Sequence, residues 1–126
     1  MGLHRQPEIP PASQRKPRYK VTGTPEFREY LEQLRESRDH EDRKLAAYID
    51  DAIDVLEERS TAGNKIPRNL WEAITKYRDE PCLFRYPLDD GYRLIYSIRK
   101  PGQDPVVVWI IEVLSHPEYD RRFHYD

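Results

Sequence analysis

The sequence predicts an α+β domain, in which a short N-terminal strand and a helical hairpin pack on a mainly antiparallel four-stranded sheet, with a short C-terminal helix or tail. Residues 25–59 hold two stretches with apolar side chains at helical spacing. Residues 82–114 hold three stretches of strand length, two of them alternating and one nearly continuous in apolar side chains. Because the helical and strand patterns occupy separate parts of the chain, they favour an α+β fold over an alternating α/β fold.

The composition limits the size of the core and the kind of site. The chain has 126 residues, about one domain, with 37% hydrophobic and 35% charged residues. Cys82 is the only cysteine, which excludes an intrachain disulfide, argues against a cysteine-ligated zinc site and fits a reducing compartment. No apolar run approaches the roughly 20 residues of a membrane span, and the basic N-terminus lacks the apolar stretch of a secretory signal. We therefore expect a cytoplasmic protein without a membrane partner.

Residues 1–17 are predicted to form a disordered, proline-rich, basic leader ahead of a domain that spans residues 18–126. The leader contains four prolines and shows no apolar periodicity. Residues 1–20 carry five Lys or Arg against one Glu, whereas residues 21–60 carry six basic against twelve acidic side chains. The net charge of −2 therefore hides a basic start and an acidic helical region. Any affinity for RNA must come from a local patch or from the leader, which is otherwise a solvated tail.

Residues 18–24 are predicted to form a short strand, and Thr24-Pro25 begins a helix that should end near residue 37. Thr24 can accept a hydrogen bond as the helix cap, and Pro25 suits the first helical position. A second helix is predicted over residues 41–59, and the short link makes the two helices antiparallel neighbours. Their apolar stripes, which we expect to be core, are Phe27, Tyr30, Leu31 and Leu34 in the first helix and Leu45, Tyr48, Ile49, Ala52, Ile53 and Leu56 in the second.

Residues 82–99 are predicted to form a β-hairpin with a three-residue loop, Asp89-Asp90-Gly91. A two-residue loop would pair Leu88 with Arg93, which sets an apolar side chain beside a charged one. The three-residue loop, with its glycine in the left-handed region, pairs Leu88 with Tyr92 and keeps the apolar faces together. We therefore expect the longer loop.

The last part of the chain is predicted to form a central strand and a short terminal element. Residues 106–114 are almost continuously apolar, as expected of a strand covered on both faces, and Glu112 is the one charge in this stretch. After it, Pro117 would open a short helix or an extended tail. Tyr119 and Phe123 would anchor this terminal element by packing.

This order of elements and one motif resemble the RelE/ParE superfamily of type II toxin–antitoxin systems. The motif is Gly91-Tyr92-Arg93-Leu94-Ile95-Tyr96. It is similar to a strand at this place in many members that reads glycine, aromatic, arginine, two hydrophobic residues and tyrosine. The ending from His116 to Phe123 also resembles a His-x-x-Tyr ending of some RelE-like proteins. The resemblance covers residues 18–126, and the proline-rich leader is an addition to the usual pattern.

The resemblance implies a function as well as a fold. It implies a RelE-like toxin that cuts mRNA in the ribosomal A site, where a 2′-hydroxyl attacks the adjacent phosphodiester without a metal or any other cofactor. The implied partners are the ribosome, mRNA and a cognate antitoxin protein, which would fold on binding. The resemblance also implies a concave sheet face with a few basic and aromatic side chains, in agreement with the polar face that the hairpin register predicts.

Three residues, Arg93, His116 and Tyr119, are candidates for catalysis. Arg93 matches the family's arginine and could stabilise the pentavalent phosphate, since a guanidinium makes paired hydrogen bonds to phosphate oxygens. It could instead pair with a carboxylate such as Glu112. His116 suits acid or base work near neutral pH, or it is only a turn residue before Pro117. Tyr119 could stack on a base or donate a proton, or it only packs.

The RNA-binding candidates are basic side chains around these three. Arg85 is expected on the same sheet face as Arg93 and could hold phosphate from the neighbouring strand. Residues 60–80 form the most basic loop outside the leader and could line the cleft. The other candidates, which could equally be ordinary surface charges, are Lys65, Lys76 and Arg78 in this loop and Arg121 and Arg122 near the end of the chain.

Two other functions stay open. One is a ParE-like inhibitor of DNA gyrase, a binding protein without catalysis. The other is a catalytically silent RelE-fold module that binds RNA, a ribosome or a protein. His116 and Tyr119 favour the nuclease over the gyrase inhibitor. The acidic helices and the net charge of −2 favour the silent module, because binding to phosphates depends on cations.

Overall fold

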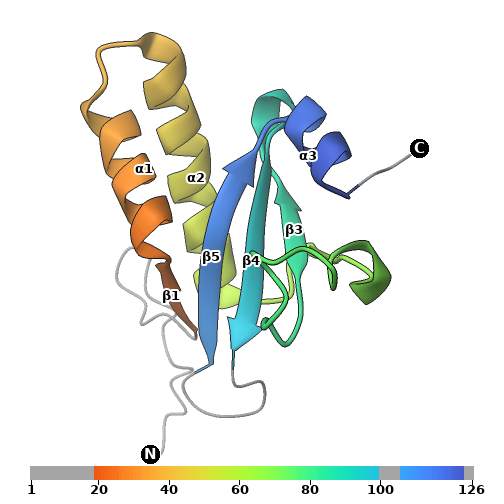
Figure 1. Ribbon diagram of the computed structural model, residues 1–126. Coiled ribbons are helices and arrows are strands. Elements are labelled where there is room, and N and C mark those ends of the chain that lie inside the picture. The colour runs from red at the N-terminus through yellow and green to blue at the C-terminus, as the bar shows by residue number, and fades with distance from the viewer. Residues whose placement is uncertain (1–18, 100–105, 124–126) are drawn as a thin grey trace, which may run out of the picture.

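The computed structural model describes residues 19–99 and 106–123, which form three α-helices and a mixed, open five-stranded sheet (Figure 1). The predicted leader and the predicted turn at residues 101–105 lie outside the described residues. No helix in the described ranges has the length and apolar character that crossing a membrane requires. The elements are β1 (Lys20–Gly23), α1 (Pro25–Glu36), α2 (His40–Glu58), β2 (Asn64–Lys65), η2 (Arg68–Leu70), β3 (Phe84–Pro87), η3 (Asp89–Gly91), β4 (Arg93–Arg99), β5 (Val107–Leu114) and α3 (His116–Phe123).

The sheet has one strand more than the four that the sequence predicts. Its order is β1-β5-β4-β3-β2, with β1 parallel to β5 and the other neighbouring pairs antiparallel. The additional strand, β2, consists of Asn64 and Lys65, which pair with Arg85 and Phe84. Both β2 residues are polar and exposed, so the apolar alternation that marks a strand in a sequence is absent there. The α+β class is confirmed and the number of strands is corrected.

The predicted helical hairpin is formed by α1 and α2, which pack side by side along the sheet (Figure 1). Thr24 caps α1, because its Oγ1 accepts a hydrogen bond from the Phe27 amide at 3.0 Å. The same hydroxyl donates to the Ile111 carbonyl at 3.4 Å, which ties the start of α1 to β5. Asp39 caps α2 by accepting from the Glu41 amide at 2.9 Å. Side-chain oxygens therefore fix both helix starts.

A first hydrophobic core fills the space between the helical hairpin and one face of the sheet. Its fully buried members include Ile49, Leu56, Leu94, Tyr96, Val108 and Ile110. Each large aliphatic side chain buried in this way contributes about 1.5–3 kcal/mol to folding. The Tyr96 hydroxyl is satisfied inside the core, since it donates to the Ser60 carbonyl at 2.8 Å and accepts from the Gly63 amide at 3.0 Å.

A second hydrophobic core covers the opposite face of the sheet. Residues 66–80 and α3 lie over this face, and the Trp71 indole donates to the Ile66 carbonyl at 3.0 Å. The second core comprises Ile66, Trp71, Tyr77, Leu83, Ile95, Ile111, Leu114, Tyr119 and Phe123. The strand predicted to be covered on both faces, β5, is covered on both. The second core therefore covers part of the sheet face that the resemblance implied to be open and concave.

The hairpin between β3 and β4 has the predicted three-residue loop. The Leu88 amide donates to the Tyr92 carbonyl at 2.8 Å, so these two residues face each other as expected. Gly91 lies in the left-handed region with φ 80°, and Asp90 also lies there with φ 60°. Asp90 is held by α2, where the Tyr48 hydroxyl donates to its carboxylate at 3.2 Å. Aspartate tolerates this backbone conformation better than most residues.

A β-bulge in β5 brings two consecutive side chains, Ile111 and Glu112, to the same side of the sheet. Ile95 pairs with Glu112 and Tyr96 pairs with Ile110, so Ile111 is an extra residue between them. Ile111 is buried in the second core, and the Glu112 side chain reaches partners on the same side of the sheet. The bulge therefore decides which face of the sheet receives the only charge of β5.

Candidate functional site

A pocket of about 450 Å³ opens where β2, β3, β4 and α3 meet. Arg85 of β3 and Arg93 of β4 both line it, as the hairpin register predicts, because Arg93 pairs with Pro87, two residues after Arg85. The remaining lining residues are Asn64, Pro87, Tyr119 and Asp120. The pocket thus combines two guanidinium groups with amide, hydroxyl and carboxylate groups.

Arg93 is half-buried at the start of β4 and is held by its own turn. Its Nη1 donates to the Gly91 carbonyl at 2.7 Å, and its Nη2 lies 3.4 Å from Nδ1 of His116. The guanidinium carbon lies 5.4 Å from the centroid of the Tyr119 ring. Among the described residues no carboxylate forms an ion pair with Arg93, so the alternative of a pair with Glu112 is not the observed arrangement.

Arg85 approaches the same tyrosine from the neighbouring strand. Its Nη1 donates a hydrogen bond to the Tyr119 hydroxyl, and its guanidinium carbon lies 5.4 Å from the ring centroid. Two cations against one aromatic ring gain from its electron-rich face but repel each other. An anion that enters the pocket would relieve this repulsion, because each guanidinium can donate paired hydrogen bonds to it.

Tyr119 is a packing residue in this structure. Its side chain is only 2% exposed and its ring lies 4.8 Å from that of Phe123, centroid to centroid. Stacking on an RNA base would require the ring to leave the second core. The geometry therefore favours the packing alternative, with the hydroxyl positioning Arg85.

His116 is the first residue of α3, and its side chain is 59% exposed beside Arg93. Its Nε2 lies 3.3 Å from a carboxylate oxygen of Asp120, one helical turn further on. The start of α3 is fixed by a capping box, in which Glu118 accepts from the Ser115 amide at 2.9 Å and Ser115 Oγ accepts from the Glu118 amide at 3.3 Å. Hydrogen bonds to the Glu118 carboxylate, first from the Ser115 amide and then from the Ser115 side chain, hold the pKa of Glu118 below its usual range. A well-defined helix start therefore presents the imidazole to Arg93.

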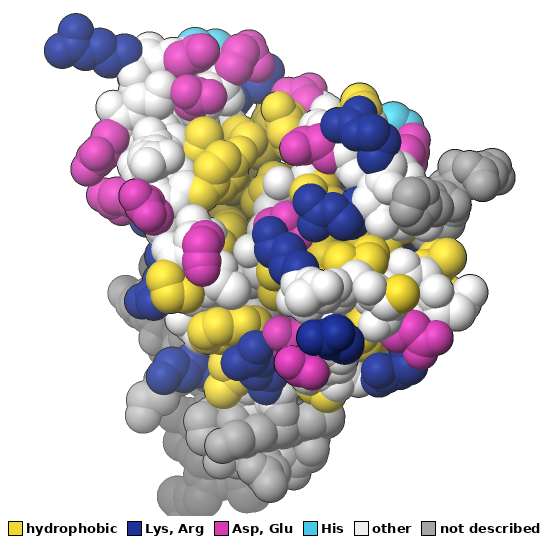
Figure 2. Space-filling model, in the orientation of Figure 1, with side chains coloured by type: hydrophobic (Ala, Val, Ile, Leu, Met, Phe, Trp, Pro, Cys, Tyr) yellow, Lys and Arg dark blue, Asp and Glu magenta, His cyan; other side chains and the backbone are white. Residues whose placement is uncertain are grey.

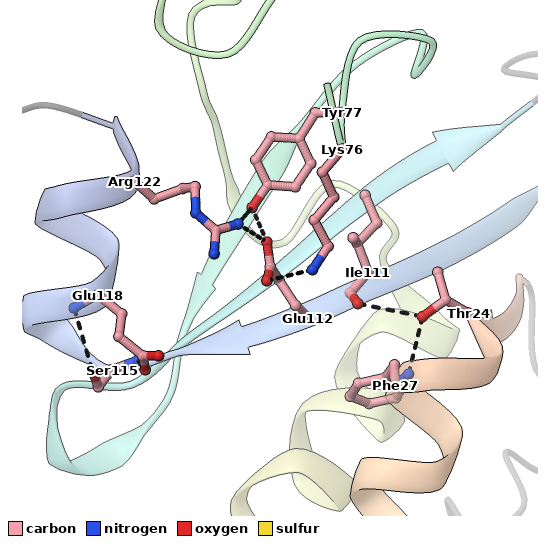
Figure 3. A network of polar contacts seen from close by, with 9 residues as sticks. All are labelled: Thr24, Phe27, Lys76, Tyr77, Ile111, Glu112, Ser115, Glu118 and Arg122. Atoms are coloured by element: carbon pink, nitrogen blue, oxygen red, sulfur yellow. Dashed lines mark hydrogen bonds and ion pairs between the residues drawn. The ribbon is translucent and has the colours of Figure 1, made fainter. Parts of the chain in front are cut away.

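A separate network surrounds Glu112 on the same side of the sheet (Figure 3). The carboxylate is 13% exposed and pairs with Lys76 at 2.8 Å and Arg122 at 2.6 Å. It also accepts a hydrogen bond from the Tyr77 hydroxyl. Burial, and then the nearby Glu112 carboxylate, raise the pKa of Tyr77 far above its ordinary value. Two predicted RNA-binding cations, Lys76 and Arg122, are thus engaged by a carboxylate.

Three further predicted RNA-binding cations, Lys65, Arg78 and Arg121, do not line the pocket. Lys65 is exposed on β2, next to Asn64, and Arg78 is exposed in the loop before β3. Arg121 is exposed on α3 and lines a different, shallow pocket of about 330 Å³. Of the nine predicted site residues, the structure gathers Arg85, Arg93, His116 and Tyr119.

Sequence reasoning missed three residues of the pocket, of which Asn64 and Asp120 have polar side chains and Pro87 does not. Asp120 follows His116 by four residues, which on the predicted terminal helix places both on one face, so this spacing was an available signal. Asn64 gave no such signal, because it reaches the pocket only through the pairing of β2 with β3. No group of three or more His, Cys, Asp and Glu side chains able to hold a metal ion occurs in residues 19–99 and 106–123.

Charge is unevenly distributed over the molecule. In Figure 2 acidic side chains gather on the helical hairpin, whereas Lys and Arg side chains are prominent over the sheet and α3. Fold and site together define an α+β protein with a cationic pocket at the edge of its second core. Comparisons with protein-family models, with curated proteins and with solved structures found no match for this chain.

Proposed function

We propose that this protein is a RelE/ParE-type toxin of a type II toxin–antitoxin system that cuts ribosome-bound mRNA without a metal. The order of a strand, a helical hairpin, an antiparallel hairpin, a further strand and a short terminal helix supports the resemblance. The two-residue β2 is a departure from the four-stranded pattern. The proposal rests on the pocket rather than on the fold alone, since one fold can serve several functions.

The observation that carries the proposal is the pairing of Arg85 and Arg93 at one pocket, with His116 3.4 Å from the Arg93 guanidinium. Two guanidinium groups can bind the phosphate oxygens and stabilise the extra negative charge of a pentavalent phosphate. An imidazole beside them can accept and return a proton at neutral pH. Phosphate binding and proton transfer are the two requirements of phosphodiester cleavage by a 2′-hydroxyl.

In the proposed reaction, His116 accepts the proton of the 2′-hydroxyl as the O2′–P bond forms. The P–O5′ bond breaks with its electron pair on the 5′-oxygen, and the imidazolium returns its proton to that oxygen through water. The products are a 2′,3′-cyclic phosphate and a 5′-hydroxyl. Arg93 and Arg85 hold the phosphate oxygens throughout, and Tyr119 positions Arg85 rather than touching the RNA.

The proposal extends to partners and location. The ribosome and mRNA would be the targets in the cytoplasm, and a cognate antitoxin that folds on binding would neutralise the toxin. The pocket uses no cofactor in this scheme, because the nucleophile belongs to the RNA itself. A catalytically silent RelE-fold binding module is the second candidate. It is favoured by the Glu112 network, which neutralises two cations that could otherwise bind RNA.

Induced expression of the full chain, followed by primer extension on cellular mRNA, tests the proposal. Cuts within translated codons are expected from the wild-type protein. Arg93→Ala and His116→Ala should each lower cleavage at least about a hundredfold without unfolding, because both residues are solvent-accessible. Arg43→Ala and His40→Ala are matched controls on the exposed surface of α2 and should leave cleavage intact.

Three outcomes would overturn the nuclease proposal. Normal growth with intact mRNA would favour the silent module. Supercoiling defects with intact mRNA would favour a ParE-like gyrase inhibitor. Growth inhibition that survives both pocket substitutions in a folded protein would show that the named residues are not the site.

A further inference from the structure

A chain of polar contacts runs from β4 to the middle of α3. Arg93 Nη2 lies 3.4 Å from His116 Nδ1, and His116 Nε2 lies 3.3 Å from an Asp120 carboxylate oxygen. Asp120 and Arg93 also line the same pocket. Each ring nitrogen of His116 therefore has one partner, and the two partners have opposite charge.

The chemistry of the two partners fixes where the imidazole proton lies. A guanidinium has only N–H donors, so a nitrogen that faces Arg93 must offer its lone pair. A carboxylate has only acceptors, so a nitrogen that faces Asp120 must carry a proton. The neutral His116 ring is consequently held with its proton on Nε2 and with a lone pair on Nδ1, on the side of the two phosphate-binding arginines.

The backbone supports this orientation of His116 from both sides. Asp120 follows His116 by four positions on α3, so their side chains share one face of the helix. On the other side lies Gly91, where an added Cβ would come within 3.4 Å of the His116 Cβ. This is an ordinary contact distance, so the β3–β4 turn packs directly beside the histidine.

The contact between His116 and Asp120 could be only a surface ion pair that stabilises the fold, but its expected contribution is small. The two side chains are 59% and 45% exposed, and an exposed pair of this kind contributes little to stability. The pair instead determines which ring nitrogen carries the proton and which keeps the lone pair that faces Arg93. Its effect should therefore be seen in proton location and turnover, with little change in folding.

We propose that Asp120 is a positioning residue, which holds His116 as the Nε2–H tautomer. The Nδ1 lone pair, which faces Arg93 in this structure, is then the base for the substrate once the Arg93 guanidinium binds the phosphate. This role rests on the proposed function, in which the imidazole accepts the 2′-hydroxyl proton. As that proton arrives on Nδ1, the ring becomes an imidazolium, and the Asp120 carboxylate stabilises the new positive charge.

The first test reads the tautomer directly in the resting, full-length protein. Nitrogen-15 NMR of the histidine rings distinguishes the two neutral tautomers, and His116→Gln identifies the His116 signals among those of the four histidines. We expect the Nε2–H pattern in the wild-type protein and in Asp120→Asn, whose amide oxygen still accepts. Asp120→Ala should give a mixture of tautomers. Asp54→Ala, an exposed charge removed from α2, is the matched control.

The second test is the rate of RNA cleavage in the same variants. Asp120→Ala should lower kcat roughly tenfold at nearly constant KM, part of the factor that a positioned base contributes, and Asp120→Asn should recover most of the loss. An Nδ1–H wild-type ring, or an Asp120→Ala spectrum identical to that of the wild type, overturns the assignment. If the spectra change as expected but the wild-type protein cuts no RNA, the proposed function fails and the tautomer assignment stands.

Discussion

Glu112 shows at the scale of single residues why a site is harder to read from a sequence than a fold. The positions of Arg85 and Arg93 follow from the alternation of a β-hairpin, so the sequence predicts their shared face correctly. The partners of Glu112 do not follow from alternation, because a bulge at Ile111 sets the face to which the carboxylate turns. The sequence therefore could not show that Lys76 and Arg122 would be engaged by it.

Removal of the Glu112 carboxylate should destabilise the protein. Glu112→Ala leaves the Tyr77 hydroxyl without its acceptor and two cations without their counter-ion, which should lower the free energy of unfolding by about 2–3 kcal/mol. Asp50→Ala removes the carboxylate of an exposed pair with Arg35 and should cost less than about 1 kcal/mol. Urea denaturation measures both values. Equal losses in the two variants would show that the Glu112 network contributes no more than a surface pair.

Two buried tyrosines predict a loss of stability at alkaline pH. Burial raises the pKa of Tyr96 to about 12, and burial and Glu112 raise the pKa of Tyr77. The unfolded chain releases these protons near pH 10 whereas the folded protein keeps them, so the unfolded state binds fewer protons above about pH 10. Stability is then fully present below about pH 10 and falls as the pH rises, by up to about 1.4 kcal/mol per pH unit for each tyrosine.

Urea midpoints measured from pH 8 to pH 11.5 check this dependence on pH. Tyr96→Phe should be less stable at pH 8, because the Gly63 amide and the Ser60 carbonyl lose their partner. Its stability should nevertheless fall less steeply above about pH 10 than that of the wild type. Parallel curves for the two proteins would contradict the prediction.

At the scale of elements, substitutions of two helix caps distinguish an effect on stability from an effect on activity. Thr24 caps α1 and Ser115 caps α3, and replacement of either by alanine should cost about 1 kcal/mol of stability. Only α3 carries His116 and Asp120. Ser115→Ala should therefore also lower RNA cleavage severalfold, whereas Thr24→Ala should leave it unchanged. Urea denaturation and a cleavage assay on both variants make the comparison, and an equal effect on cleavage would argue against a role for the α3 start.

Most elements were predictable because each has a local cause. The apolar stripes and Thr24 predict α1 and α2 to within a residue or two, and Tyr119 and Phe123 anchor α3 as expected. The strand at Asn64 was missed because two polar residues carry no periodic signal, and it exists only by pairing with β3. Elements fixed by local patterns are thus readable in a sequence, and elements fixed by a distant partner are not.

At the scale of the whole molecule, charge separation sets the strength of RNA binding. The acidic helical hairpin and α3, which lines the pocket, lie on opposite sides of the sheet (Figure 1), and the pocket offers two guanidinium groups. Neutralising about two phosphates of single-stranded RNA predicts a slope near −1.4 in a plot of log affinity against log salt concentration. Arg85→Ala and Arg93→Ala should each reduce that slope by about 0.7.

Fluorescence anisotropy with a short 2′-O-methyl RNA, which lacks the attacking hydroxyl, measures this slope without cleavage. Arg43→Ala on α2 is the control and should leave the slope unchanged. A much steeper slope in the wild type would mean that cations outside the pocket bind the strand. We expect a shallow slope because Glu112 already neutralises Lys76 and Arg122, which could otherwise bind phosphates.

The parallel pairing of β1 with β5 has a consequence for the protein as it is made. Lys20 faces Val107 and Gly23 faces Ile110, so β1 cannot pair with β5 until residues 107–110 have been translated. Until then one edge of β4 also stays unpaired, because β5 lies between β1 and β4 in the sheet. Nascent chains therefore present open strand edges, which invite aggregation or capture by chaperones. Closure of so long a loop should also make folding slower than in helical proteins of the same size.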